Sequence, residues 1–461
     1  MPESLPNLVL IVLDCGRRDH FSCYGYKRET TPNIDRIASQ GILFERAYAA
    51  SCWTIPSHAS LFTGLYPSQH RADANENYLD NAHTTLAELL SRRGYRTANI
   101  TCNGFISRHT NLDKGFELSI DVGALRGSGG GWIQAGIRGI HRRVRDLTAK
   151  DRGARRATAL ASRWLGEQRS GLPFFLFMNY MDCHLPYRLR GRDRFRFLGA
   201  TDRRRAERAL QDPFAVMAGA RTMSQQELID LQALYDASLV HLDRQIGELD
   251  ARLQELGLAD ETVFVITSDH GESFGEHRLL DHQYGLYEHL INVPLVMRLP
   301  RGERTGEVRR DFVQHVDLVP TVREWLGQSA APTDAGSHAG RSIFGGAPRQ
   351  AVMAEYLVPN VRAIRRRFPQ ADTSRFDVAM RCIRTDHFKL VERSDGKHEL
   401  YDLDADPFER MNLAGSRADL VVRLQAQLQY QLGSLHRGDT RDRDTSTPPE
   451  VRQRLEALGY L

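Results

Sequence analysis

The sequence predicts an α/β fold in which helices sandwich a mixed, mostly parallel sheet, followed by a smaller α+β subdomain with an antiparallel sheet. Apolar, strand-like runs alternate with helix-like segments over the first part of the chain, which is typical of a parallel sheet. After about residue 345, short strands follow one another between turns, which favours antiparallel pairing. We therefore expect one large domain over residues 1–345 and a smaller unit over residues 346–461.

The composition is that of an ordinary soluble globular protein. The 461 residues are 41% apolar and 26% charged, and a formal net charge of +4 gives no reason to expect a nucleic-acid partner. No basic region precedes the short apolar run at the N-terminus, and no stretch approaches the ~18 apolar residues of a membrane span. The six cysteines show no paired spacing, which indicates reduced thiols. These features predict a cytoplasmic protein without a membrane span.

The first predicted strand covers residues 7–13, a continuous apolar run that indicates burial on both faces of a parallel sheet. It ends at Asp14. Ligands of open α/β sheets bind beyond the carboxyl ends of the strands, so Asp14 is a candidate metal ligand, and the alternative is that it caps a turn. A helix over 31–38 follows, with Pro32 at its start and Gly41 after its end.

Thr54 opens the next predicted helix and is the candidate nucleophile. Pro56 suits the first turn of a helix, and the apolar positions that follow stop at Gly64. At a helix N-terminus, backbone N–H groups and the helix dipole favour a phosphate or sulfate beside the threonine hydroxyl. Threonine also caps helices often, and this stretch alone leaves both roles open.

The middle of the chain continues with strands and helices in alternation. We expect a helix over 84–93, strands over 95–101 and 174–179, a long helix over 225–256 and a strand over 262–267. Residues 120–225 contain a glycine-rich segment and two arginine-rich blocks, which we interpret as a basic insertion. Such blocks are solvated surfaces or, more rarely, collect a large anionic substrate around a pocket.

Two of these strands end in residues that can hold a metal. One leads to Asp182 and His184, and the other leads to Asp269 and His270. Carboxylate oxygen and imidazole nitrogen together suit Mn²⁺ or Zn²⁺, and Ca²⁺ less readily. His282 follows in a polar loop, so it is not expected to be a core residue.

The remaining elements complete the large domain and build the smaller unit. A strand is expected over 293–298, and a helix opens at 315–321. The smaller unit is expected to contain strands over 351–356, 378–384 and 388–391, a helix over 417–432 and a terminal helix over 450–461.

Taken together, these segments resemble the sulfatase family of the alkaline-phosphatase superfamily over almost the whole chain. The matching segments stand in the family's order: 9–14 (VLIVLD), 24–26 (YGY) with 31–35 (TPNID), 54–58 (TIPSH) with 63–68 (TGLYPS), 268–272 (SDHGE), 315–318 (HVDL), 384–390 (RTDHFKL), and 400–403 (LYDL) with 406–409 (DPFE). The resemblance implies an alkaline-phosphatase-like fold. It also implies a metal held by Asp14, the Thr54 oxygen, Asp269 and His270.

The resemblance also implies roles in binding and proton transfer. Asn75 is similar to the asparagine that contacts a substrate oxyanion in related members, and His58 and Lys389 are further candidates for substrate binding. His184 and His282 fall where the family places residues that bind the anion or protonate the leaving group. Many sulfatases carry lysine in place of His282, so the charge there would depend on pH.

Three residues depart from the sulfatase pattern. Sulfatases oxidise a cysteine, or in some cases a serine, to formylglycine within a Cys-x-Pro-x-Arg motif, whereas here Thr54 stands at that position and His58 replaces the arginine. Cys52 cannot substitute, because the proline lies four residues on rather than two. Cys15 replaces a second aspartate, which removes a hard ligand and makes a calcium site less expected. Related members with threonine at this position transfer phosphoryl-type groups, as phosphodiesterases, phosphonate hydrolases or phosphoalcohol transferases.

We therefore expect a metal-dependent hydrolase or transferase that acts without formylglycine, with Thr54 as nucleophile on a phosphate mono- or diester or a phosphonate ester. A plain alkoxide ester must be opened at its central atom, and phosphorus accepts that second attack more readily than sulfur. The cofactor is expected to be Mn²⁺ or Zn²⁺, with Ca²⁺ or Mg²⁺ as alternatives. The substrate is expected to be a small molecule or an anionic ester of a glycan or lipid, and the oligomeric state stays open.

Alternatives remain for both activity and metal content. The first is a sulfuric-ester hydrolase that acts without formylglycine, and the second is a non-catalytic binding protein that retains the fold. Asp182, His184 and His282 could build a second metal site, although a single metal needs fewer assumptions.

Overall fold

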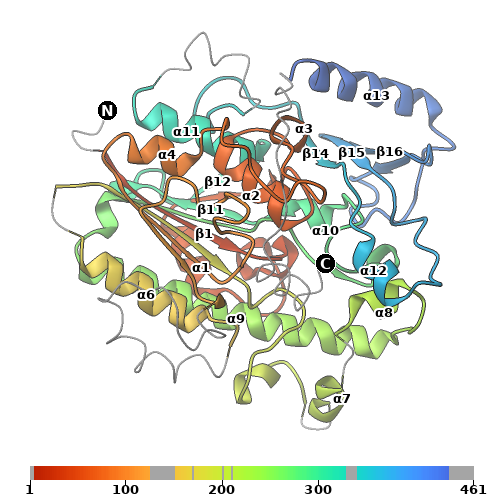
Figure 1. Ribbon diagram of the computed structural model, residues 1–461, viewed down its shortest axis with the longest axis horizontal. Helices are drawn as coiled ribbons and strands as arrows, with labels where there is room; N and C mark the ends of the chain where they lie inside the picture. Colours follow the sequence, from red (N-terminus) through yellow and green to blue (C-terminus); the bar gives the residue numbers. More distant parts are fainter. Residues whose placement is uncertain are drawn as a thin grey trace.

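An eight-stranded sheet forms the centre of the computed structural model, in the order β12-β2-β11-β7-β1-β6-β4-β5 (Figure 1). The structure describes residues 5–124, 151–168, 171–199, 202–208, 211–328 and 340–435. The strands are β12 (Glu307–Arg309), β2 (Ile42–Phe44), β11 (Leu295–Arg298), β7 (Thr262–Thr267), β1 (Asn7–Leu13), β6 (Phe174–Tyr180), β4 (Arg96–Thr101) and β5 (Leu118–Asp121). Neighbouring strands pair in parallel except where β11 meets β7 and β2. The predicted mixed, mostly parallel sheet is confirmed.

Helices cover both faces of this sheet, so β1 is buried along its whole length. Odd-numbered residues from 9 to 13 pack on one face with α1, α6 and α9, and even-numbered residues from 8 to 12 pack on the other face with α2, α4 and α11. Figure 1 shows α6 and α9 on one side of the sheet and α2, α4 and α11 on the other. These helices are α1 (Pro32–Ser39), α6 (Ala154–Gly166), α9 (Gln225–Glu255), α2 (Thr54–Thr63), α4 (Leu86–Ser91) and α11 (Leu318–Trp325).

Most predicted elements lie within a few residues of their expected bounds, and two differences have a clear physical reason. The helix predicted over 84–93 is shorter, because Thr85 and Glu88 form a capping box that fixes its start. The single strand predicted over 293–298 is wrong, since β10 (Asn292–Val293) and β11 belong to different sheets. Pro294 separates them, because proline has no N–H to donate to a strand ladder.

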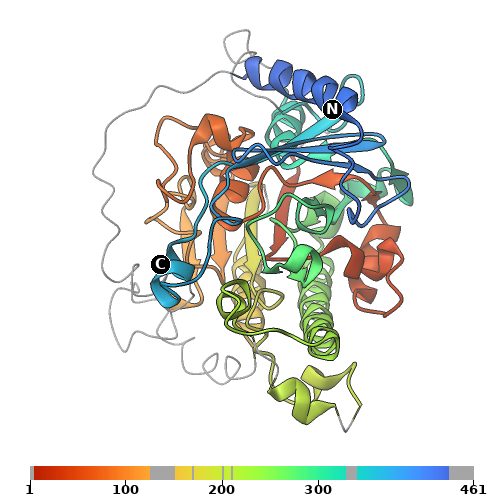
Figure 2. The ribbon, with the colours of Figure 1, turned by 90° about the vertical axis from the view of Figure 1, so that its right-hand side faces the viewer.

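A second, antiparallel sheet of β14, β15, β16 and β17 lies beneath α13 in the C-terminal part of the chain (Figure 2). Its elements are β14 (Ala351–Tyr356), β15 (Met380–Thr385), β16 (Phe388–Arg393), β17 (Glu399–Asp402) and α13 (Ala418–Gly433). The predicted antiparallel C-terminal sheet is therefore confirmed. The predicted terminal helix lies outside the described residues, as does part of the basic insertion.

Shorter elements connect these layers. They are β3 (Ala47–Tyr48), β13 (Val313–Gln314), β8 (Ser273–Phe274), β9 (Leu280–Asp281), α3 (Pro67–His70), α7 (Arg203–Glu207), α8 (Pro213–Met217), α10 (Glu288–Ile291) and α12 (Arg362–Arg367). The short sheet β10-β3-β13 lies beside the main one. Within the described residues, no helix is long and apolar enough to cross a membrane.

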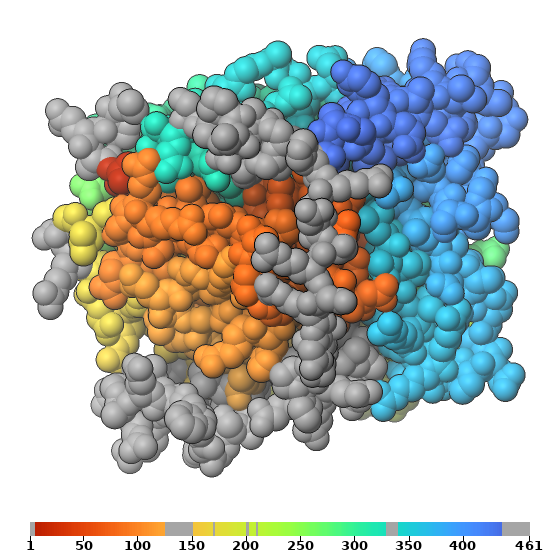
Figure 3. All heavy atoms as spheres, turned by 45° about the horizontal axis from the view of Figure 1, so that its top comes forward, coloured from red at the N-terminus to blue at the C-terminus, as the bar shows by residue number. Residues whose placement is uncertain are grey.

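The C-terminal unit packs directly against the N-terminal segments, as the space-filling view shows (Figure 3). Ala50, Tyr66 and Val316 of the first part share an apolar cluster with residues of β14–β17 and α13. A buried ion-pair triad adds to this contact, since Lys389 Nζ of β16 lies 3.2 Å from Glu288 Oε1 and 2.8 Å from Glu409 Oε1. The two units are thus joined by apolar packing and by buried charge.

This triad corrects the expected role of Lys389. Its side chain is fully buried, and its ammonium faces the carboxylates of Glu288 and Glu409. A lysine that is enclosed between two acids has its charge matched within the protein. The structure therefore gives Lys389 a place in the contact between the units, where the sequence led us to expect a substrate contact.

Replacing Lys389 by methionine should destabilise the protein by about 3–5 kcal/mol, because the buried Glu409 carboxylate and the partly buried Glu288 carboxylate lose this cation. Lys397→Met changes an exposed lysine of the same sheet region and should leave the free energy of unfolding almost unchanged. Denaturant unfolding of both variants measures the difference. Equal stability of Lys389→Met and Lys397→Met would contradict the proposed contribution of the triad.

Candidate functional site

The candidate site lies where three adjacent parallel strands end. β1 pairs with β6 on one side and β7 on the other. Asp14 directly follows β1, Asp269 and His270 follow β7, and His184 follows β6. Because parallel strands present their carboxyl ends at the same edge of the sheet, these side chains are brought together.

Asp14, Asp269 and His270 form the centre of this group. One ligand atom from each lies within 4.8 Å of the others, and all three side chains are fully buried. Asp269 Oδ2 lies 3.2 Å from His270 Nε2. The sequence-based expectation that these three residues could share a metal is consistent with this arrangement.

Thr54 is the first residue of α2. The first turn of this helix contacts Asp269, which lies shortly after the end of β7. Ser57 Oγ donates a hydrogen bond of 2.6 Å to the carbonyl oxygen of Asp269, and His58 Nδ1 lies 3.6 Å from Asp269 Oδ2. The same His58 nitrogen lies 2.9 Å from the Thr54 carbonyl oxygen. Thr54 therefore sits at a buried helix N-terminus beside the carboxylate group, and His58 belongs to the same group.

The electrostatics of the group favour a bound cation. Burial, and then the neighbouring Asp269 carboxylate, raise the pKa of Asp14. Burial opposes ionisation of Asp269 as well, but the imidazole of His270 outweighs it and lowers the pKa of Asp269. Burial alone would lower the pKa of His270, yet Asp269 and Asp14 raise it to about 9. Two buried carboxylates thus hold positive charge on the imidazole beside them.

Unsatisfied polar atoms point to the same conclusion. Thr54 Oγ1 is buried and makes no hydrogen bond within the described part of the chain, while the buried Asp269 Oδ2 and His270 Nε2 contact each other at 3.2 Å without a well-aligned hydrogen bond. Buried polar atoms normally have a partner, and two carboxylates with an imidazole are a suitable donor set for a divalent cation. The residues present therefore fit the metal that the sequence predicts.

Asn103 supports this group, and the sequence reasoning missed it. Its side-chain Nδ2 donates a hydrogen bond of 2.7 Å to Asp14 Oδ2, while its Oδ1 accepts one of 2.9 Å from the Phe105 N–H. Both hydrogen bonds fix the orientation of the Asp14 carboxylate. Asn103 follows β4 at the same edge of the sheet, so the strand-end argument applied to that strand would have found it.

His184 and His282 lie together on the other side of His270. The ring centroids of His184 and His282 are 4.8 Å apart, and the ring of His282 stacks on that of His270 at 4.4 Å. Burial, with a smaller effect of His282, lowers the pKa of His184 well below its usual range. Burial thus disfavours the positively charged form of His184.

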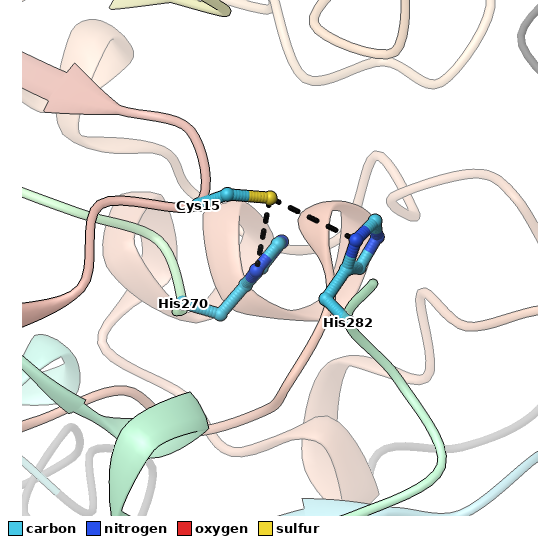
Figure 4. Close-up of side chains that lie close together, drawn as sticks. All are labelled: Cys15, His270 and His282. Atoms are coloured by element: carbon cyan, nitrogen blue, oxygen red, sulfur yellow. Dashed lines mark hydrogen bonds between the residues drawn. The ribbon is translucent and has the colours of Figure 1, made fainter. Parts of the chain in front are cut away.

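Cys15 lies between these histidines (Figure 4). Its Sγ is 3.8 Å from His270 Nδ1 and 3.7 Å from His282 Nδ1, and its backbone has a φ of 63° that non-glycine residues rarely adopt. The Sγ also lies 3.6 Å from Asp14 Oδ1. The residue that departs from the family pattern after Asp14 thus places a sulfur atom among the candidate ligands.

The loop that carries His282 has an unusual backbone. Non-glycine residues with positive φ gather in it: His277, Arg278, Asp281, Gln283 and Tyr284. Asp281 Oδ1 lies 2.5 Å from His282 Nδ1, which fixes the imidazole ring. Such conformations persist only where the surroundings hold them, and they gather at functional sites.

Two residues named by the sequence reasoning lie elsewhere. Asn75 is exposed, and its Oδ1 accepts a hydrogen bond of 3.3 Å from Arg362 Nη2. Asp182 is buried in a separate group, where its Oδ1 accepts from the Arg152 N–H at 2.9 Å and His241 Nε2 lies 3.0 Å from Asp151 Oδ2. The structure thus does not bring Asn75 to Thr54, and it pairs Asp182 with residues other than His184 and His282.

The chain is similar to known proteins in both sequence and structure. A sequence model of the sulfatase family, described as Sulfatase, matches residues 6–328, and one described as N-sulphoglucosamine sulphohydrolase, C-terminal, matches residues 275–437. The chain is 28% identical to the multifunctional alkaline phosphatase superfamily protein PehA of Trinickia caryophylli, over 89% of this chain and 92% of that protein. It is 25% identical to an N-acetylglucosamine-6-O-sulfatase of Bacteroides thetaiotaomicron, over 89% and 83%.

A solved structure shows the same fold. The phosphonate monoester hydrolase of Agrobacterium radiobacter superposes with a TM-score of 0.71 and 22% identity, over 93% of this chain and 95% of that one.

Changing Asp269 to asparagine should weaken binding of a divalent cation by at least about tenfold, because one of two anionic ligands is lost. Asp243→Asn is the matched control, since Asp243 is buried too but accepts the N–H of Ile34 at 2.8 Å at the start of α1. This control should lower stability by about 1–2 kcal/mol and leave metal binding intact. Elemental analysis after dialysis, together with denaturant unfolding, tests both variants. Equal metal content in Asp269→Asn and the wild type would contradict the site.

Proposed function

The chain belongs to the sulfatase family, and on that premise we propose that it hydrolyses a phosphate or phosphonate ester with Thr54 as nucleophile and a divalent cation as cofactor. The observation that carries this proposal is the hydroxyl of Thr54, which is buried at the N-terminus of α2, a helix whose first turn contacts Asp269 through Ser57 and His58. The substrate class is an anionic ester on a small molecule, a glycan or a lipid.

A threonine nucleophile, in place of formylglycine, favours a phosphorus ester over a sulfate ester as substrate. A formylglycine hydrate releases sulfate by C–O cleavage, whereas an ester on threonine must be opened by a second attack at the central atom. Phosphorus accepts that attack more readily. Cys52 offers no substitute nucleophile, because burial raises the pKa of its thiol to about 12.

The residues around Thr54 have separable tasks in this proposal. A divalent cation bound by Asp14, Asp269 and His270 would lower the pKa of the Thr54 hydroxyl and neutralise non-bridging oxygens of the ester. His58 holds the first turn of α2 against Asp269, and so fixes the direction of attack. The N-terminus of that helix favours the anionic group.

Release of the alcohol completes the first half of the reaction. Thr54 Oγ1 gives its proton to solvent and forms a bond to phosphorus as the bond to the leaving oxygen breaks. The group of His184 and His282 meets the charge on that oxygen, which then takes a proton from solvent and departs as the alcohol. Water, or an acceptor alcohol in a transfer reaction, then opens the phosphothreonine and restores the hydroxyl.

A second candidate is a sulfuric-ester hydrolase that acts without formylglycine. It is supported by the match of residues 275–437 to the C-terminal model of N-sulphoglucosamine sulphohydrolase. A silent binding protein is less favoured, because buried, charge-perturbed residues at strand ends are typical of catalytic sites.

A panel of aryl phosphate monoesters, diesters, phosphonate esters and sulfate esters separates these functions. We expect the highest kcat/KM for a phosphorus ester, measured with Mn²⁺, Zn²⁺ and Ca²⁺ in separate assays. Higher kcat/KM for a sulfate ester would establish the second candidate. No turnover of any ester with any metal would favour the binding protein.

Thr54→Ala should lower kcat by at least ~10³-fold, because no other hydroxyl replaces the nucleophile. Thr54→Ser keeps a hydroxyl and should retain measurable turnover. Thr63→Ala is the matched control in the same helix, where Thr63 Oγ1 donates to the Ala59 carbonyl at 2.6 Å, and it should affect stability more than kcat.

Peptide mass spectrometry provides the chemical check on Thr54. The peptide that contains Cys52 and Thr54 should have its unmodified mass even after co-expression with a formylglycine-generating enzyme. An aldehyde at either residue would overturn the preference for phosphorus esters.

A further inference from the structure

A second group of candidate ligands lies beside the first. It contains Cys15, His184, Asp281 and His282, all buried. Cys15 follows β1, His184 follows β6, Asp281 ends β9, and His282 comes directly after it. Sulfur, nitrogen and oxygen donors from three separate segments thus converge at one place.

We propose that Cys15, His184, Asp281 and His282 hold a second divalent cation, of the thiophilic class that includes Zn²⁺. This inference rests on the proposed function, because it assigns a source for the positive charge that meets the leaving oxygen. It concerns residues that the first cation does not use.

The distance between Cys15 and His282 is close to the one expected between two ligands of a tetrahedral centre. With Zn–S near ~2.3 Å and Zn–N near ~2.0–2.1 Å, ligand atoms of a tetrahedral zinc stand about 3.5 Å apart. Cys15 Sγ lies 3.7 Å from His282 Nδ1, and ligand atoms of His184, Asp281 and His282 all lie within 4.8 Å of one another. Cys15 and His184 also approach within 4.8 Å. Asp281 Oδ1 stands only 2.5 Å from His282 Nδ1, so these two atoms must move apart before both can ligate one ion.

His270 belongs to the first group, although its ring touches the second. Its Nδ1 lies 3.0 Å from the Gly271 carbonyl oxygen, and its Nε2 faces Asp269. His184 Nδ1 likewise faces a carbonyl oxygen, that of Leu185. A metal-ligating histidine commonly anchors its second nitrogen in this way, which fixes the direction of the ligating one.

The balance between buried negative charge and bound cations distinguishes a site with two ions from a site with one. A first dication balances Asp14 and Asp269, and a second balances Asp281 and the Cys15 thiolate, whose proton passes to the solvent on binding. Glu272 is a further buried carboxyl near Asp281, but burial raises its pKa well above the usual value, so it adds no clear negative charge to this balance. The two carboxylates of the first group and the carboxylate and thiolate of the second thus suit one dication each.

Thiolate and imidazole ligands also select the metal. Sulfur donors favour Zn²⁺ and its surrogate Co²⁺ over Ca²⁺ and Mg²⁺, which prefer oxygen. The second centre should therefore bind Co²⁺ with a thiolate-to-cobalt charge-transfer band, a signal that does not depend on catalysis.

The test uses the full chain, stripped with a chelator and reloaded with Co²⁺ or Zn²⁺. We expect two equivalents of metal and the charge-transfer band in the wild type. Cys15→Ser should retain one equivalent without the band, and Asp269→Asn should retain one equivalent with it. Cys382→Ser changes an equally buried cysteine in β15 and should keep both equivalents and the band.

The wild-type measurement decides the inference even if Cys15→Ser fails to fold. One equivalent of metal, with or without the band, would overturn the second site, and so would two equivalents without the band. The ester panel tests the proposed function separately. Two equivalents with the band but no turnover of phosphorus esters would support this site and count against the proposed function.

Discussion

Two buried carboxylates at the ends of neighbouring strands set the constraint on which the site depends. β1 and β7 run in parallel, with Val12 opposite Thr267, so Asp14 and Asp269 follow them at the same edge of the sheet. Neither side chain is exposed to solvent, and like charges in a desolvated place raise each other's energy. His270 relieves part of this cost, and a divalent cation would relieve the rest. The strand order thus places two buried carboxylates close together, and they favour a bound positive charge even in the absence of substrate.

The surrounding residues are placed in relation to these two carboxylates. Asn103 orients Asp14 by a hydrogen bond, and Ser57 and His58 tie the first turn of α2 to residue 269. The position of Thr54 is therefore fixed relative to Asp269. The C-terminal unit does not supply these residues, but its buried triad around Lys389 and its apolar contacts hold it against the segments that do.

Sequence patterns predicted the strand ends well, because a buried parallel strand is a continuous apolar run and its end is a local feature. Asp14, Asp269 and His270 could be found for that reason. The partners of Asn75 and Lys389 could not, because Arg362 and Glu409 stand in other parts of the sequence and meet them only through the tertiary fold. This limit on prediction from sequence also applies to residues that lie close together in one segment. Asp182 and His184 are two residues apart in sequence, yet they face different groups, since Asp182 accepts the Arg152 N–H while the ring of His184 lies against His282.

The proposed second cation depends on the proposed role of Thr54 as nucleophile, whereas the role of Thr54 does not depend on the second cation. Attack needs Thr54 and the first group alone, whereas the leaving oxygen gains its charge on the opposite side of the central atom. His184 Nδ1 faces the Leu185 carbonyl oxygen, and a histidine that ligates a metal commonly anchors its second nitrogen in this way. Cys15, the residue that departs from the family pattern after Asp14, therefore acts in our proposal on the departure of the alcohol and leaves the attack of Thr54 to the first group.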